Sequence, residues 1–260
     1  MGQHGSQGSF DFKSSTLFNP QLKQTERNRF VLNYRRTFHL VNGTRYRDYT
    51  FGRLTLEDGR SLALLQPTIS CPAMLVKMPR TAGGKWMCLT SDVLSRTCTI
   101  VSAGSRDDTG FEEGIRFYNL FCSIFIFDPF NPPSQTKWKK YHIREKGIGN
   151  PNHQLCNNIK CVYPYSLREA LRREGQDTLT TLKLDIEGEE WNIIKQTPWC
   201  KLNSNQVLME FHDKNLVLSI RSIVVNIFWP LEPCNFHLFA LEPVPSGHKG
   251  QFEMAFLRLT

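Results

Sequence analysis

The chain has 260 residues, of which 40% are hydrophobic, and a formal net charge of +8. This length and apolar content support one large core, or one core with a small appendage, and exclude a chain that is too polar to fold. No apolar run is long enough to span a bilayer, and the first thirty residues lack the apolar centre of a secretory signal, which favours a cytoplasmic over a secreted protein.

The N-terminal part differs in composition from the rest. Residues 1–28 are rich in Gly, Ser, Gln and Asn and are expected to form a disordered tail, although Gly2 fits the loose myristoylation pattern. Residues 29–82 are expected to form an accessory β-rich extension with a hairpin at Asp58-Gly59. Arginines are dense between residues 27 and 60, which indicates a solvated basic face or, as an alternative, an RNA-binding surface.

Eight cysteines are present, without a CxxC pair of zinc-like spacing. Cys98 and Cys122 adjoin apolar strands and are interpreted as small buried hydrophobic residues. Cys156 and Cys161 bracket a polar loop and would close a disulfide in an oxidising compartment. Because no signal segment is recognised, free thiols are the expectation.

From Thr97 onward the pattern alternates between strands and helices, which is typical of a parallel sheet with crossover helices. The last two strands are joined by a short segment with two prolines and a glycine, which cannot hold a crossover helix, so they should be antiparallel neighbours. The predicted elements are strands at 97–101, 123–127, 141–144, 182–186, 206–211, 236–241 and 252–259, helices after capping boxes at 109–112 and 166–169, and an amphipathic helix over 216–227.

The sequence thus predicts an α/β fold over residues 83–260, Rossmann-like, with a seven-stranded, mostly parallel sheet that ends in an antiparallel hairpin. Ligands of such sheets lie at the carboxyl ends of the strands. There the chain places the turn at 102–105 with Gly104, then Asp128 with Pro129, then Asp185 with Glu187, and finally His212. The glutamates after Gly188, including Glu190, are interpreted as a solvated helix start.

Several of these segments resemble class I S-adenosylmethionine-dependent methyltransferases, and more narrowly the FkbM-type domain with its animal relatives in the methyltransferase-like 24 group. The resemblance covers roughly residues 83–260. It is carried by IVSAGSRDDTGFE at 100–112, FDP at 127–129, LKLDIEGEEW at 182–191 and LMEFH at 208–212.

The resemblance implies S-adenosyl-L-methionine as cofactor and methyl transfer as activity. It places the turn from Ser102 through Ala103 and Gly104 to Ser105 beside the methionine part, and Asp128 at the ribose. Asp185 would lie near the amino end or the accepting group. Acids at the strand tips suit a cofactor that carries a sulfonium and an ammonium.

The chain departs from the family pattern, because Ser102 stands where many class I enzymes have an acid. Asp107 or Asp108 is the candidate to restore that charge, with Asp108 preferred, while the other would cap the helix. Methylation of oxygen needs a base, for which Asp185, Glu187 and His212 are the candidates. No metal is predicted, since two carboxylates make an incomplete ligand set. The acceptor and the oligomeric state are left open, and the alternative is an inactive binding scaffold.

Overall fold

Seven strands form one sheet in the order β10-β11-β9-β8-β3-β4-β5. The structure is a computed structural model that describes residues 67–79, 84–132, 134, 140–212, 224–244 and 251–259. In chain order the strands are β3 (Thr99–Ala103), β4 (Ser123–Phe127), β5 (His142–Arg144), β8 (Leu179–Leu184), β9 (Ser204–His212), β10 (Phe236–Pro243) and β11 (Gln251–Arg258).

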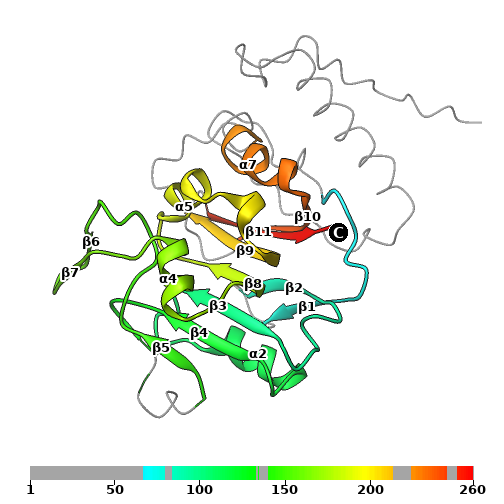
Figure 1. The fold of residues 1–260 in the computed structure, drawn as a ribbon, viewed down its shortest axis with the longest axis horizontal. Coiled ribbons are helices and arrows are strands. Elements are labelled where there is room, and N and C mark those ends of the chain that lie inside the picture. Colours follow the sequence, from blue (N-terminus) through cyan, green and yellow to red (C-terminus); the bar gives the residue numbers. More distant parts are fainter. Residues whose placement is uncertain are drawn as a thin grey trace, which may run out of the picture.

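Strand β11 runs antiparallel to β9 and β10, and the pairs from β9 to β5 are parallel. The predicted fold class is therefore confirmed, including the closing antiparallel hairpin. Since β3, β4, β5, β8 and β9 point the same way, their carboxyl ends share one edge of the sheet (Figure 1).

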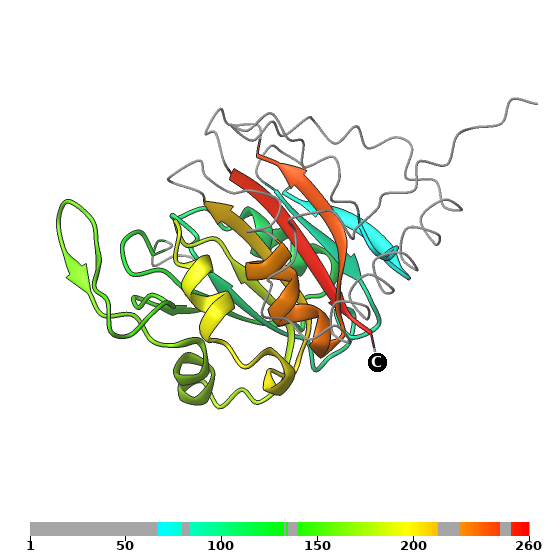
Figure 2. The same cartoon turned by 90° about the horizontal axis from the view of Figure 1, so that it is seen from above.

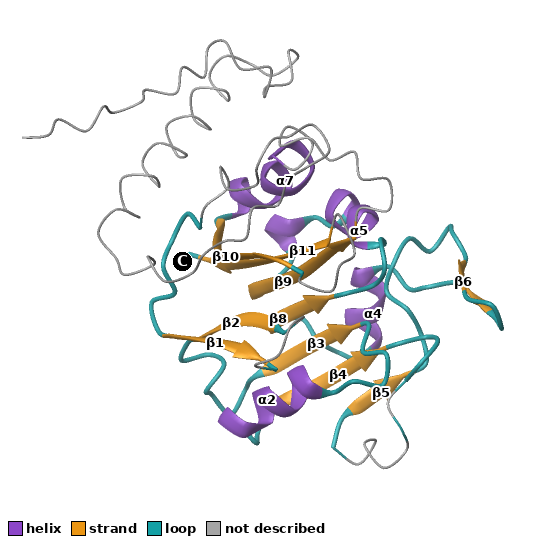
Figure 3. Cartoon of the chain, turned by 180° about the vertical axis from the view of Figure 1, so that it is seen from behind, coloured by secondary structure: helices purple, strands orange, loops and turns teal. Residues whose placement is uncertain are grey.

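Each face of the sheet has its own cover. The helices α4 (Leu167–Arg173), α5 (Glu190–Gln196) and α7 (Trp229–Leu231) pack on one face, together with the π-helical turn Val224–Phe228 and the short 3₁₀ helix Trp199–Lys201. The helix α2 (Gly110–Tyr118) and the strands β1 (Met74–Met78) and β2 (Lys85–Leu89) cover the other face (Figure 3).

Side chains alternate between the two faces along each strand, which decides which of them face α2, β1 and β2. In β8, Leu182 and Leu184 enter the core under α4 and α5, so Lys183 faces the α2 side. In the same way Phe252 and Met254 of β11 leave Glu253 on the α2 side, directly opposite Glu210 of β9 in the register. Charged residues of the sheet are thus turned towards β1 and β2.

The strands β1 and β2 form an antiparallel hairpin, and β2 also contacts β9 and β11. The side-chain amide of Gln206 bonds to both backbone groups of Cys88, with Cys88 N–H donating at 3.0 Å and Gln206 Nε2 at 2.7 Å. Strand β1 lies before the predicted domain boundary at residue 83 and β2 after it, and the division itself stays a prediction.

One of the two predicted capping boxes forms, and the other does not. At α4, Ser166 Oγ accepts a hydrogen bond from Glu169 N–H at 3.2 Å, as the capping box predicts. At α2 the predicted box is wrong, because Glu112 turns inward and accepts a bond from Ser102 Oγ at 2.5 Å. Phe111 and Ile115 are buried on one face of α2 as expected, with Tyr118 packed beside them.

The prediction of free thiols is wrong, because all eight cysteines form disulfides. Cys98 and Cys122 do not act as separate buried hydrophobic residues: they precede the neighbouring parallel strands β3 and β4, which brings their Cα atoms to 4.6 Å. Spacing along the chain could not reveal a pair that depends on strand order. The bonds are Cys71–Cys88, Cys98–Cys122, Cys156–Cys161 and Cys200–Cys234.

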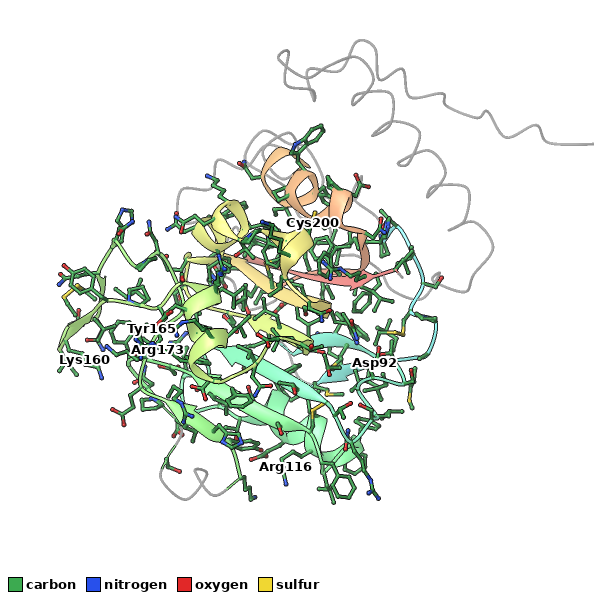
Figure 4. All side chains as sticks on the ribbon, viewed as in Figure 1. Asp92, Arg116, Lys160, Tyr165, Arg173 and Cys200 are labelled. Atoms are coloured by element: carbon green, nitrogen blue, oxygen red, sulfur yellow. A yellow bond between two sulfur atoms is a disulfide. The ribbon has the colours of Figure 1, made fainter. Side chains whose placement is uncertain are left out.

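Between β5 and α4 an arm leaves the body of the molecule, and its two short strands are β6 (Leu155–Cys156) and β7 (Cys161–Val162) (Figures 1 and 2). Lys160 lies on the arm and Tyr165 at its base, where the Arg173 guanidinium stands 4.6 Å from the ring centre (Figure 4). No helix among the described residues is long and apolar enough to cross a membrane. The expected tail, the Asp58-Gly59 hairpin, the basic region at 27–60 and most of the segment 216–227 lie outside the described residues.

Candidate functional site

The turn after β3 brings three strand ends into direct contact. Gly104 has a left-handed backbone with φ of 78°, and its N–H donates to Phe127 O at 2.9 Å, at the end of β4. A Cβ atom at this position would lie 1.6 Å from the carbonyl oxygen of Asp185, beyond the end of β8. Only glycine allows the turn to approach so closely.

Backbone strain is concentrated at the same edge. Among the described residues, four that are not glycine have positive φ, and three of them lie here: Arg106 at 49°, Asp107 at 64° and Glu187 at 57°. Such conformations cost about 1–3 kcal/mol each and persist where the surrounding structure enforces them, most often at functional sites. Arg106 Nη1 and Glu187 Oε1 also form an ion pair of 3.0 Å across the edge.

Asp128 is buried and holds the turn through its two carboxylate oxygens. Oδ2 accepts from the backbone N–H groups of Ser105 at 2.9 Å and Arg106 at 2.8 Å. Oδ1 accepts from Phe130 N–H at 2.9 Å and Asn131 N–H at 2.8 Å. This carboxylate therefore orders the turn, and its lone pairs are already used by backbone amides.

Asp185 lies between two ammonium groups. Its Oδ2 is 3.0 Å from Lys85 Nζ of the hairpin and 3.7 Å from Lys183 Nζ of its own strand. Burial acts to raise the pKa of Asp185, but the charges of Lys183 and Lys85 outweigh it and lower that pKa to about 2. Lys183 also donates to the carbonyl oxygens of Ala103 and Gly104, which ties β8 to the glycine turn.

Lys85 is the centre of a buried charge cluster that the sequence analysis missed. Besides Asp185, its Nζ contacts Glu210 Oε2 at 2.6 Å and Glu253 Oε1 at 2.5 Å. Burial acts to lower the pKa of Lys85, yet Glu253, Asp185 and Glu210 raise it, while burial raises the pKa of Glu253 well above its ordinary value. The sequence does contain an indication of this cluster, because Lys85, Glu210 and Glu253 each lie in a largely apolar strand. Charged residues that are buried in this way need partners of opposite charge.

The sequence analysis also misinterprets the environment of Glu190. The interpretation as part of a solvated helix start is wrong, because its side chain is 0% exposed. Its carboxylate accepts from Ile186 N–H at 2.6 Å and Gly188 N–H at 2.8 Å, and its Oε1 lies 3.1 Å from His212 Nδ1. The helix start folds back over the loop that carries Asp185 and Glu187, so the acid is enclosed.

The remaining predicted residues have mixed positions. Ser102 is fully buried and bonded to Glu112, and Ala103 and Pro129 are also buried. Ser105 contributes its backbone N–H to Asp128. Asp108 is exposed, and its Oδ1 accepts from Gly110 N–H at 2.8 Å, which caps the start of α2. Of the predicted set, Gly104, Asp128, Asp185, Glu187 and His212 are the ones gathered at the strand ends.

A metal ion is not assigned to this cluster. Asp185, Glu190 and His212 each offer a ligand atom, and these atoms lie within 4.8 Å of one another. The chain's own groups already compensate these oxygens, because Lys85 faces Asp185 and two backbone amides face Glu190.

A sheet with this order and a glycine turn at the carboxyl ends of its strands define a Rossmann-like α/β domain, a class whose ligands bind at that edge. The chain belongs to the methyltransferase domain family, whose model matches residues 61–258. A search of curated proteins finds no match.

Solved structures that are similar to this one include several methyltransferases, at low sequence identity and with TM-scores below 0.5. A fibrillarin pre-rRNA processing protein from Methanococcus jannaschii has 7% identity and a TM-score of 0.42, over 72% of this chain and 83% of that one. A putative methyltransferase from Streptococcus mutans in complex with SAH has 11% identity and a TM-score of 0.34, over 65% and 91%. Aeropyrum pernix fibrillarin with natively bound S-adenosyl-L-methionine has 8% identity and a TM-score of 0.38, over 78% and 92%.

Proposed function

We propose that this methyltransferase domain uses S-adenosyl-L-methionine and transfers the methyl group to an oxygen atom of an acceptor, as an FkbM-type enzyme. The observation that carries the proposal is the meeting of Gly104, Asp185 and Glu187 at one edge of the sheet, with a strained backbone on both sides. This is the edge at which ligands of open α/β sheets bind.

The chemistry of the rim fits the cofactor. Asp185 and Glu187 present carboxylates beside the glycine turn, with side chains that are 26% and 52% exposed, and carboxylates stabilise a sulfonium and an ammonium. When bound, the cofactor supplies an electrophilic methyl group. Contact of Asp128 with the ribose would require an exchange of partners, because four backbone N–H groups already occupy its oxygens.

The protein's part in the reaction is to align the acceptor and to receive its proton. Holding the reacting atoms in line removes much of the entropic barrier. Asp185, fixed by Lys85 and Lys183, is suited to orient the donor side, while His212 lies at the end of β9 with its ring directed to the same rim. Glu187 and Arg106, paired across the edge, are placed to contact whatever enters.

A binding scaffold without catalysis is the second candidate. The saturated Asp128 and the ion pairs of Asp185 favour it, because each group that would contact the cofactor already has a partner within the chain. An enzyme would exchange these internal partners for the cofactor, whereas a scaffold would keep them.

Calorimetry with S-adenosylhomocysteine tests the proposal. We expect binding by the unaltered protein, loss of binding in Asp185→Asn, and full binding in Asp92→Asn, whose carboxylate lies at the opposite end of the strands and contacts Asn205. Absence of binding by the unaltered, folded protein would support the scaffold. A labelled methyl donor added to cell extract, followed by mass spectrometry of the products, would then identify the acceptor.

A further inference from the structure

We infer that Glu190 is a positioning residue that holds His212 with Nε2 facing the rim, and that His212 rather than Asp185 or Glu187 takes the proton of the acceptor. The inference rests on the proposed function, because it concerns the same site. It rests on contacts that the sequence did not reveal, since Glu190 was expected in solvent.

Glu190 cannot move independently of the site. Its carboxylate is fully buried, and both oxygens accept backbone N–H groups of the loop 186–188. This loop follows Asp185 and includes Glu187, so one carboxylate fixes the loop and the ring of His212 together. A side chain with so many constraints provides a preorganised support.

The two ring nitrogens of His212 have different surroundings. Nδ1 lies 3.1 Å from Glu190 Oε1, and the backbone oxygen of His212 accepts from Trp191 Nε1 at 3.0 Å, so the ring is held at Nδ1 and the main chain of the residue at its carbonyl. An ionised carboxylate can only accept hydrogen bonds, so Nδ1 carries the proton of the neutral ring. The lone pair of Nε2 is then directed away from Glu190.

Nε2 of His212 lies among acids. It faces Glu210 Oε1 at 3.4 Å, Glu187 Oε2 at 3.8 Å and Asp185 Oδ1 at 3.9 Å. The charged groups around the ring are therefore acids from α5, from the loop 185–187 and from β9, with Lys85 of the hairpin behind Asp185 and Glu210. An imidazole in this position can receive a proton, and the nearby acids stabilise the imidazolium.

The other two candidates are poorer bases. Asp185 is paired with two ammonium groups, which stabilise its ionised form and weaken its attraction for a proton. Glu187 is half exposed and bound to Arg106. Although burial acts to lower the pKa of His212, the hydrogen bond and charge of Glu190, together with the charges of Asp185 and Glu210, outweigh it and raise that pKa above its ordinary value.

The chemical step balances without a further reactant. The acceptor oxygen forms a bond to the methyl carbon while the carbon–sulfur bond breaks, and that electron pair stays on sulfur. The proton of the acceptor hydroxyl passes to Nε2 of His212, which becomes an imidazolium and later returns the proton to water.

Imidazole NMR of the full chain tests the dyad without knowledge of the acceptor. We expect the unaltered protein to show His212 in the Nδ1–H form when neutral, with the signal identified by its loss in His212→Asn. In Glu190→Gln the pKa of His212 should fall by about one pH unit, because a neighbouring opposite charge is removed. Glu189→Gln is the matched control, because it removes the same charge from the adjacent residue. The Glu189 carboxylate accepts Asn150 N–H and is not the partner of His212 Nδ1.

Two results would overturn the inference: a neutral His212 protonated at Nε2, or a pKa that Glu190→Gln leaves unchanged. If Glu190→Gln fails to fold, Glu190→Asp keeps the charge but withdraws it from Nδ1, and a smaller decrease in the His212 pKa is expected. Once the acceptor is known, the acid limb of the kcat profile should move to lower pH in Glu190→Gln. Lack of S-adenosylhomocysteine binding would refute the proposed function separately, whatever the NMR result.

Discussion

Replacing Gly104 with alanine perturbs the contact between two strand ends by a single carbon atom. The new Cβ would lie 1.6 Å from Asp185 O, although real Cβ atoms essentially never approach within 3.0 Å. The left-handed backbone adds a cost of about 1–2 kcal/mol. Relief of the overlap must move backbone rather than a flexible side chain, and overpacking of this kind costs about 1–3 kcal/mol. We therefore expect Gly104→Ala to lower the free energy of unfolding by about 2–5 kcal/mol.

Gly175 provides the matched control, because it has a similar left-handed φ of 63° but no atom within 4 Å of its Cβ position. Gly175→Ala should therefore show only the conformational cost of about 1–2 kcal/mol. The assay is urea unfolding of both variants, with calorimetric binding of S-adenosylhomocysteine beside it. We expect binding to be lost in Gly104→Ala alone, and equal destabilisation of the two variants would refute the close approach as the reason for glycine at position 104.

Three further changes test two buried charged groups and one disulfide. Lys85→Met leaves carboxylates unpaired and should cost about 3–5 kcal/mol at pH 7; because those carboxylates bind protons more readily in the folded variant than in the unfolded chain, urea unfolding should show the deficit shrinking as the pH falls from 8 to 5. Asp128→Asn presents an amide to two backbone donors and should cost about 2–5 kcal/mol by the same assay, with loss of S-adenosylhomocysteine binding. Cys98→Ser with Cys122→Ser opens a loop with a sequence separation of 24 residues and should cost about 3.5 kcal/mol. Alkylation of the native, unreduced protein before mass spectrometry should label no cysteine, and labelling of that pair would contradict the bond.

The features that could be predicted from the sequence are those with a local cause. The strand 123–127 is correct at both ends, because a run of apolar residues meets Asp128-Pro129 and cannot continue. The capping box at Ser166 works for the same reason, since its partner lies three residues away. The antiparallel closing hairpin followed from the length of a connection. In each case the deciding contacts lie within a few residues along the chain.

The features that could not be predicted depend on neighbours distant in sequence. Lys85 meets Glu210 and Glu253 only because the hairpin lies over the middle of the sheet, more than a hundred residues away in the chain. The partner of Cys98 is decided by the parallel pairing of β3 with β4. Glu190 was misjudged because an acid in a first helical turn normally faces water, and here the loop closes over it.

The strand-end rim breaks several local rules at once, and the violations compensate one another. Non-glycine residues adopt left-handed backbones at Arg106, Asp107 and Glu187, and carboxylates are buried at Glu190 and beneath the hairpin. The strained turn is held by the carboxylate of Asp128, and the strained loop at 187 is held by that of Glu190. At Arg106 and in the loop around Glu187 the unfavourable backbone is thus matched to an acid that accepts amide donors, so strain and buried charge stabilise each other there, whereas Asp107 N–H donates to the backbone oxygen of Asn131. A chain selected for stability alone would need neither feature. Proteins follow the local rules of structure at most positions and break them mainly at functional sites, so strain and buried charge at the same edge are expected of such a site.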